Sequence, residues 1–228
     1  MGTDTAAMSA TAAPGRSSIA DRLAAIPRPA PVMARERAAG LTARQRELLD
    51  ELADLIADGF AHLTMADIAA RLGCSLRTLY GIGASRDELV LVACDRSLWA
   101  TGRRARAALD ESGIDLRELV RRYLGAASQA VRATTVAFST DLAAVPGGTA
   151  LHRAHSEYLV AITKELLDMA VAHGEIVPVD TAVIARAMAG ISNVFVQPDV
   201  LEALSGSPKD AIDHVVDIIL RGLAAPTD

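Results

Sequence analysis

The chain has 228 residues, of which 51% are hydrophobic and only 3% aromatic, and its net charge is −5. This length can bury a sizeable core in one or two domains. The alanine-rich, aromatic-poor composition favours close-packed helices over a β-sandwich, whose strands need β-branched and aromatic residues at period two. No apolar run approaches the roughly 18 residues of a membrane span, and no basic-then-apolar signal peptide begins the sequence, so we expect a cytoplasmic protein without a membrane partner.

The charge divides unevenly along the chain. Residues 1–110 contain 14 Arg and no Lys against 13 acidic residues, whereas residues 111–228 contain 9 basic against 15 acidic residues. The acidic second part should avoid nucleic acid, while the arginines of the first part can be concentrated on one surface. The asymmetry therefore favours two functional halves.

Residues 1–40 are rich in Ala, Ser, Thr and Pro, and we expect a disordered arm with at most a short helix near residues 18–26. Its basic residues are Arg16, Arg22, Arg28, Arg35 and Arg37. A basic arm ahead of a DNA-binding helical unit can enter the neighbouring minor groove, and it can equally be a solvated tail. The sequence leaves both alternatives open.

The first long helix is predicted over residues 41–57, where Thr42 and Gln45 can form a capping box. Apolar residues then recur at i, i+3, i+4 and i+7 within residues 64–72, which predicts a short amphipathic helix that ends at Gly73. Ser75 can cap a second short helix that ends near Tyr80. Two short helices joined by a glycine-containing turn are the pattern of a helix-turn-helix, whose second helix can enter the major groove of DNA.

This stretch resembles the DNA-binding domain of the tetracycline-repressor (TetR) family of bacterial transcriptional regulators. The matching residues are Gly59, Phe60, Thr64, Ile68, Ala69, Gly73, Ser75, Thr78, Leu79, Tyr80, Ser85, Arg86 and Leu89. The chain departs from the family pattern at three positions. Ile82 stands where the family usually has a histidine, Gly83 where it has an aromatic residue, and Gly81 where many members have a large side chain.

The resemblance and the outward positions of the second helix imply which residues contact DNA. Leu76, Arg77 and Gly81 are expected at base edges. Phosphates are expected to be held by Thr64, Thr78, Tyr80 and Arg86, with the capping residue Ser75 in the same predicted interface. The predicted DNA-binding domain spans residues 41–95.

Only helical patterns follow. A helix from residue 86 to about 109 connects the predicted head to a second domain of residues 96–228, with further helices over residues 116–133, 134–145, 149–173, 180–195 and 207–223. The predicted fold is therefore all-α, with an N-terminal helix-turn-helix head of three helices and a C-terminal helical domain for ligand binding and dimerisation.

The last two predicted helices carry more apolar surface than one small domain needs, which indicates a partner. The resemblance implies that this pair joins its twin in a four-helix homodimer interface. The predicted interface residues are Val183, Ala187, Ile191, Ile212, Val215, Val216, Ile219 and Leu223. A twofold dimer would hold two recognition helices about 34 Å apart, which matches successive major grooves of a palindromic operator.

A small-molecule effector is expected in the second domain, in a mostly apolar cavity with a few polar groups. The candidate residues are Trp99, Phe138, Leu142, His152, His155, Tyr158, Met169 and Phe195. They can form either a site for a hydrophobic or amphipathic ligand or simply part of the core. The sequence does not decide between these alternatives.

No motif for catalysis or for a cofactor is present: the chain lacks a glycine-rich phosphate loop, a zinc-protease helix and a serine elbow. Two histidines three residues apart, His152 and His155, make only a weak metal pair, and Cys74 and Cys94 are expected as core cysteines. We therefore expect a ligand-responsive transcriptional repressor that leaves its operator when the effector binds. The alternative is a helical enzyme or scaffold whose helix-turn-helix is only structural.

Overall fold

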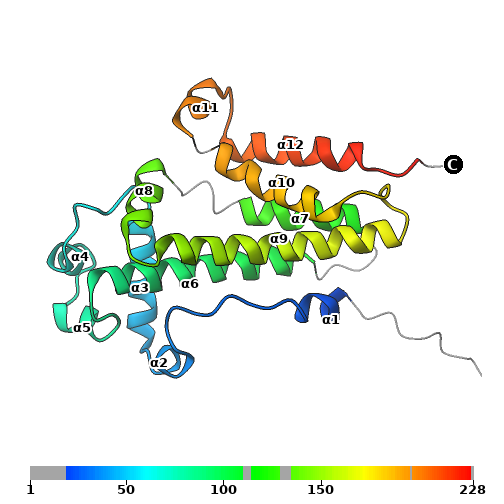
Figure 1. The fold of residues 1–228 in the computed structure, drawn as a ribbon. Helices are drawn as coiled ribbons and strands as arrows, with labels where there is room; N and C mark the ends of the chain where they lie inside the picture. Colours follow the sequence, from blue (N-terminus) through cyan, green and yellow to red (C-terminus); the bar gives the residue numbers. More distant parts are fainter. Residues whose placement is uncertain (1–18, 110–113, 129–134, 196, 227–228) are drawn as a thin grey trace, which may run out of the picture.

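The computed structural model describes residues 19–109, 114–128, 135–195 and 197–226. Their secondary structure is helical apart from one isolated bridge between Ile176 and Ala224, so the predicted all-α fold is confirmed (Figure 1). The helices are α1 (Ile19–Ala24), α2 (Arg35–Ala39), α3 (Ala43–Leu55), α4 (Met65–Arg71), α5 (Leu76–Tyr80), α6 (Arg86–Ala107), α7 (Leu116–Ala127), α8 (Val136–Ala144), α9 (Gly148–Ala172), α10 (Thr181–Val194), α11 (Pro198–Ala203) and α12 (Pro208–Gly222). None of these helices is both long and apolar enough to cross a membrane.

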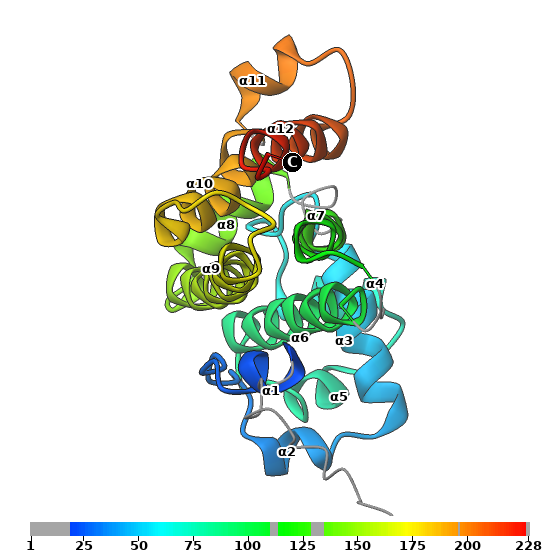
Figure 2. The same cartoon turned by 90° about the vertical axis from the view of Figure 1, so that its right-hand side faces the viewer.

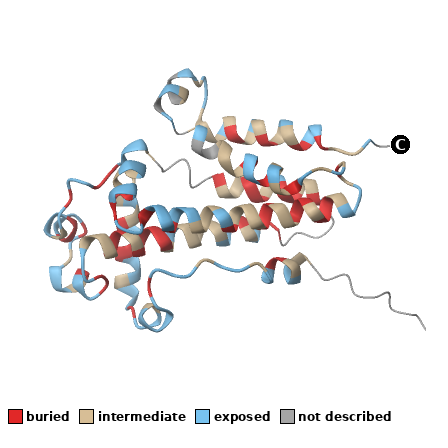
Figure 3. Cartoon of the chain, in the orientation of Figure 1, coloured by how far each residue is buried: buried red, intermediate tan, exposed pale blue. Residues whose placement is uncertain are grey.

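The buried side chains form two hydrophobic cores. The head core joins α3, α4, α5 and the first half of α6 to Leu142 of α8 and Leu151 of α9. The second core joins the other half of α6 to α7, α9, α10 and α12. Helices α6 and α9 contribute to both cores: buried residues recur along α9, whereas those of α6 lie towards its two ends (Figure 3). The head is therefore attached to the second domain through packed helices.

The starts of the head helices follow from their capping residues. Thr42, Thr64, Ser75 and Ser85 each accept a hydrogen bond from the backbone N–H three residues on, which confirms the capping predicted for Thr42 and Ser75. Helix α4 ends at Arg71, and Gly73 follows its C-cap residue Leu72 with a φ of 58°, in the left-handed region that glycine adopts without strain. The Cys74 N–H then donates to Ala69 O (2.9 Å), and this bond closes the turn before α5.

Residues 19–40, which we call the strap, are ordered, although the sequence favoured a disordered arm up to residue 40 with at most a short helix near residues 18–26, where α1 lies. Figure 2 shows the strap on the opposite side of α6 and α9 from α12. Leu23 of α1 is buried in the second core, and Met33 is buried in the head core. Between them, the Val32 N–H donates to Asp95 Oδ2 of α6 (3.0 Å). The strap thus spans both domains, and residues 1–18 lie outside the described residues.

Two further details differ from the predicted elements. Helix α11 lies in the stretch between residues 197 and 206, for which the sequence indicated no helix. The helix predicted over residues 116–133 ends at Ala127, where the Ser128 side chain donates to Gly125 O (2.9 Å), and residues 129–134 are not among those described. Neither difference changes the packing of the two cores.

Leu23→Ala should lower the free energy of unfolding by about 2–4 kcal/mol, because it removes a fully buried leucine side chain from the second core. Val32→Ala is the matched control, since it shortens an exposed apolar residue of the same strap and should change stability by less than about 0.5 kcal/mol. Urea denaturation followed by circular dichroism measures both. Equal stabilities of the two variants would show that the burial of Leu23 in the second core does not stabilise the fold.

Candidate nucleic-acid interface

Helices α4 and α5 form the helix-turn-helix that the sequence predicted. Their inward side chains, Ile68, Ala69 and Leu79, are buried in the head core. On the outside of α5, Leu76 is 42% exposed and Tyr80 is 52% exposed, and Arg77 is exposed beside them. A five-residue helix therefore presents an apolar, a basic and an aromatic side chain to the solvent.

The serine and threonine hydroxyls of the predicted interface are already hydrogen-bonded at the starts of α4 and α5. The Ser75 and Thr78 hydroxyls lie 2.9 Å apart, and the Thr64 hydroxyl donates to Asp67 Oδ2 (2.6 Å). Hydrogen bonds from Thr64 lower the pKa of Asp67, which keeps this carboxylate ionised at the start of α4. Thr64 and Ser75 remain exposed and Thr78 is half-buried, so a phosphate would have to share hydroxyls that stabilise the two helix starts.

The two arginines predicted to contact DNA differ in their surroundings. Arg77 makes no hydrogen bond or ion pair with any described residue, so its guanidinium is available to a partner. Arg86 instead donates from Nη1 to Ala61 O and Leu63 O, both at 3.3 Å, and pairs with Asp87. The phosphate contact expected of Arg86 is thus in competition with a role inside the protein, where Arg86 holds the loop that precedes α4.

The chain after α5 shows a physical reason for its departures from the TetR pattern. Ile82 is completely buried and fills the head core. Gly83 lies against the first turn of α6, where a Cβ atom would be 2.9 Å from the Leu89 backbone nitrogen. Gly81 is exposed, and a Cβ atom there would be 3.2 Å from both Gln45 Nε2 and Thr78 O. A larger residue at position 83 could not follow this backbone path.

Three of the eight predicted effector residues gather between α6 and α9. The Trp99 ring contacts His155 and Tyr158, with ring centroids 5.2 and 5.9 Å apart. His155 Nε2 lies 2.8 Å from Asp95 Oδ1, and both side chains are buried. Arg106 Nη1 donates to the Tyr158 hydroxyl (2.9 Å). We call Trp99, His155, Tyr158, Asp95 and Arg106 the Trp99 cluster; within it His155 is bonded to Asp95 and Tyr158 to Arg106.

The other five predicted effector residues lie elsewhere, so the eight residues do not line one cavity. Phe138 packs edge-on against Phe60, and Leu142 is buried with it in the head core. Met169 is buried in the second core, Phe195 packs at its edge, and His152 is exposed. Phe138 and Leu142 are separated from the rest because α8 binds the head: the Ala61 N–H donates to Asp141 Oδ2 (2.7 Å), and the Thr135 hydroxyl donates to Ala57 O (3.0 Å).

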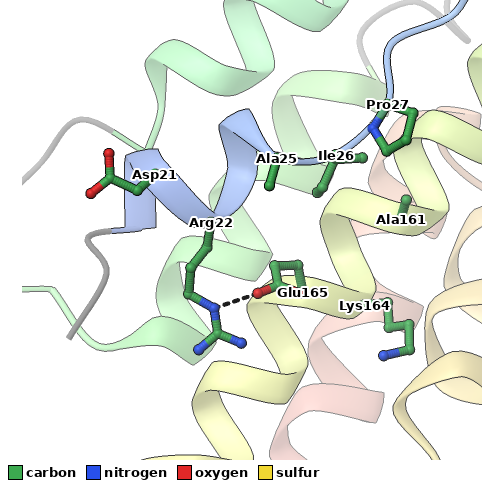
Figure 4. Close-up of a pocket in the computed structure, with 8 residues that line it drawn as sticks. All are labelled: Asp21, Arg22, Ala25, Ile26, Pro27, Ala161, Lys164 and Glu165. Atoms are coloured by element: carbon green, nitrogen blue, oxygen red, sulfur yellow. Dashed lines mark hydrogen bonds and ion pairs between the residues drawn. The ribbon is translucent and has the colours of Figure 1, made fainter. Parts of the chain in front are cut away.

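A surface groove of about 540 Å³ lies between α1 and α9 (Figure 4). Arg22 and Glu165 form an ion pair across it, and Ile26 and Ala161 provide apolar lining. None of the eight predicted effector residues lines this groove. Among the described residues, no three His, Cys, Asp or Glu side chains converge in the manner of a metal site.

The predicted dimer interface divides into two groups. Ile212, Val216 and Leu223 are buried within the protomer, so their assignment to a surface between two copies is wrong. Ile191, Val215 and Ile219 are half-buried, while Val183 and Ala187 are exposed. Sequence periodicity placed all of these residues on apolar faces, but it could not show that α7 and α10 already pack against α12 within the protomer.

The uncovered apolar side chains of α10 and α12 lie at helical spacing. Val183 is 59% exposed and Val194 is 54% exposed, and Ala187 and Gly190 lie between them on α10. Ile218 of α12, which the sequence analysis did not select, is also 54% exposed. We call these five residues the apolar flank. Branched aliphatic residues exposed to this extent on neighbouring helices are typical of an interaction surface.

No protein-family model matches the chain, and no curated protein matches it in sequence. Solved structures do match its fold. The TetR-family transcriptional regulator PfmR from Thermus thermophilus is 24% identical, with a TM-score of 0.57 over 76% of this chain and 97% of its own. A TetR transcription regulator from Haloarcula marismortui is 15% identical, with a TM-score of 0.68 over 81% of this chain and 100% of its own.

The ketosteroid transcriptional regulator KstR2 of Mycobacterium tuberculosis is a third such structure. It is 21% identical, with a TM-score of 0.58 over 82% of this chain and 97% of its own. All three matches extend over most of this chain and nearly the whole of the other protein. The chain therefore has the fold of TetR-family transcriptional regulators.

Gly83→Ala should destabilise the protein by about 1–3 kcal/mol, because the added methyl group meets backbone atoms of α6 that cannot move independently. Gly102→Ala is the matched control: it lies inside α6 with open space around its Cβ position, so alanine should stabilise by about 0.5–1 kcal/mol. Thermal and urea unfolding measure both variants. A Gly83→Ala protein as stable as the wild type would contradict the close approach of this loop to α6.

Proposed function

We propose that this protein is a homodimeric transcriptional regulator of the TetR type, which binds a palindromic DNA operator through α5. One observation carries the proposal: a capped helix-turn-helix exposes Leu76, Arg77 and Tyr80 on its second helix while Leu79 anchors that helix in the core. The side chains near the N-terminus of such a helix read base edges in the major groove. The likeness to TetR-family structures over most of the chain supports the same assignment.

The rival class, a helical enzyme or scaffold with a purely structural helix-turn-helix, explains the exposed side chains less well. A helix that serves only packing has no reason to present a leucine and a tyrosine to water, because apolar side chains gain stability when they are buried. A purely structural helix also gives no reason for Arg77 to be left without an ion pair among the described residues. A DNA duplex provides partners for all three side chains: a thymine methyl group, a guanine edge and a phosphate.

Dimerisation is supported by the apolar flank. Helices α10 and α12 lie next to each other at one side of the second domain (Figures 1 and 2). A second copy related by a twofold axis would cover Val183, Val194 and Ile218 with the same residues of its own. The small residues Ala187 and Gly190 between them would allow close helix approach. This arrangement would give two α5 helices for the two half-sites of a palindrome.

The effector is proposed to be a hydrophobic or amphipathic small molecule that acts through α6. This helix contributes to the head core at one end and carries Trp99 beside His155 and Tyr158 of α9 further along. A ligand that separates α6 from α9 near Trp99 would tilt the head. It would release DNA, as expected of a repressor, only to the extent that it binds the tilted state more tightly than the DNA-bound state.

Selection of DNA fragments by the purified protein tests the proposal. Selected fragments should share a palindromic sequence and outcompete random DNA in a gel-shift assay. The cognate affinity should be on the order of a thousandfold or more above the random affinity at the same salt concentration. Uniform binding to all fragments, or none, would refute the DNA-binding regulator and favour the structural alternative.

Arg77→Ala should weaken cognate binding by about 1–3 kcal/mol while changing random-DNA binding little, because Arg77 is free and lies early in the recognition helix. Fluorescence anisotropy with the selected site and with a scrambled site measures the two affinities. Equal losses on both sequences would assign Arg77 to a phosphate.

Ile218→Asp should convert the dimer into a folded monomer, because a carboxylate buried between two copies costs several kcal/mol. Val136→Asp introduces the same charge at another exposed β-branched residue, on α8, and should leave the dimer intact. Sedimentation reports mass, and circular dichroism reports helix content. A dimeric Ile218→Asp protein with unchanged operator affinity would place the interface elsewhere.

A further inference from the structure

Arg37 of α2 connects the strap to the chain that leaves the recognition helix. Its Nη2 donates to Ile82 O (2.8 Å), and its Nη1 pairs with Glu88 Oε1 (2.7 Å) on the first turn of α6. The other carboxylate oxygen of Glu88 accepts from the Ala84 N–H (2.7 Å). One guanidinium and one carboxylate therefore hold both ends of the three-residue segment from Ile82 to Ala84.

This segment has little of its own to keep it in place. Helix α5 is only five residues long, and helices of this length are marginal without tertiary contacts. Gly81 and Gly83 flank Ile82 and contribute no side-chain packing. The buried side chain of Ile82 anchors the segment from within, and Arg37 binds its backbone from outside. A cation at the C-terminal end of a helix also interacts favourably with the helix dipole.

The position of Arg37 is determined by residues on both sides of α2. Before α2, Met33 is buried in the head core and the Val32 N–H is bound to Asp95. At the end of α2, Ala39 O accepts from Arg46 of α3 (3.4 Å). The Ala84 N–H and the Arg37 guanidinium lower the pKa of Glu88, so its carboxylate stays charged under neutral conditions. The ion pair is thus formed by groups that the surrounding structure places.

We propose that Arg37 is a positioning residue for DNA binding: it holds the C-terminal end of α5 at the orientation that the recognition helix needs, without itself touching DNA. The inference rests on the proposed DNA-binding function. It gives the strap a role different from that of a minor-groove arm, because the guanidinium is directed to Ile82 O and Glu88.

The two roles of Arg37 predict different losses. A phosphate contact contributes equally on every sequence, and its removal reduces the steepness of the salt dependence by about one unit of log affinity per log salt. A positioning contact affects the fit of α5 to its cognate bases, so its removal lowers the ratio of cognate to random affinity. Loss of the contact also loosens the backbone in the absence of DNA, which a phosphate contact does not predict.

The test compares Arg37→Ala with Arg35→Ala in the full-length protein. Arg35 is the matched control, because it is exposed on the same helix, carries the same charge and makes no hydrogen bond or ion pair with a described residue. Hydrogen exchange of the amides of Ile82, Gly83 and Ala84 is measured without DNA. Affinities for the selected operator and for a scrambled duplex are then measured over a salt series.

For Arg37→Ala we expect faster amide exchange, an order-of-tenfold fall in the cognate-to-random ratio and an unchanged salt slope. Arg35→Ala should leave the exchange and the ratio at their wild-type values. A reduced salt slope with an unchanged ratio would overturn the inference and assign Arg37 to phosphate. If Arg37→Ala binds the operator with wild-type affinity and keeps the wild-type ratio of cognate to random affinity, the inference is overturned while the proposed function stands. If the wild-type protein selects no sequence, the proposed function fails and the inference fails with it.

Discussion

The structure depends on α6 being shared between two cores. This single helix of 22 residues, about 33 Å long, buries Leu89, Val90 and Ala93 in the head and Ala105 in the second domain. Because packed interiors are close to crystal density, a displacement of α6 at one core must be met by rearrangement at the other. The head therefore cannot turn as a freely hinged module. This constraint explains how an effector could be coupled to DNA binding, because α9 runs beside α6 and also enters both cores.

The parts of the fold that the sequence predicted are those with local causes. Thr42, Thr64, Ser75 and Ser85 are capping residues whose partners lie three positions away, and Gly73 closes its turn through neighbouring backbone. The helix-turn-helix and the exposed residues of α5 followed from these signals together with the family resemblance. The strap did not, because its proline-rich composition predicted at most a short helix near residues 18–26 and did not show that Leu23 and Met33 are buried. Their stabilisation comes from cores that are built by helices later in the chain.

The proposed dimer surface shows what periodicity cannot resolve. Helix α12 has apolar residues around more than half of its circumference. Such a pattern indicates that two faces of the helix are covered, but it does not show which neighbour covers each face. In the structure, Ile212, Val216 and Leu220 face the protomer core, whereas Ile218 faces away from it. The predicted effector residues are divided for the same reason: Phe138 and Leu142 are apolar residues of the second half of the sequence, but α8 packs them on the head. Burial can be predicted from composition, but the identity of the covering partner requires the tertiary arrangement.

The end of the recognition helix depends both on local sequence and on a tertiary contact. The glycines at positions 81 and 83 weaken a very short helix at the point where the TetR pattern usually places larger residues. Gly83 is required in this structure because the Leu89 backbone approaches too closely for a side chain. Stability that local side chains cannot provide has to come from elsewhere, and here Arg37 binds Ile82 O from 45 positions earlier in the chain. The loss of side chains after α5 and the ordering of the strap are therefore two parts of one arrangement. The sequence shows each part separately, and only the tertiary contact connects them.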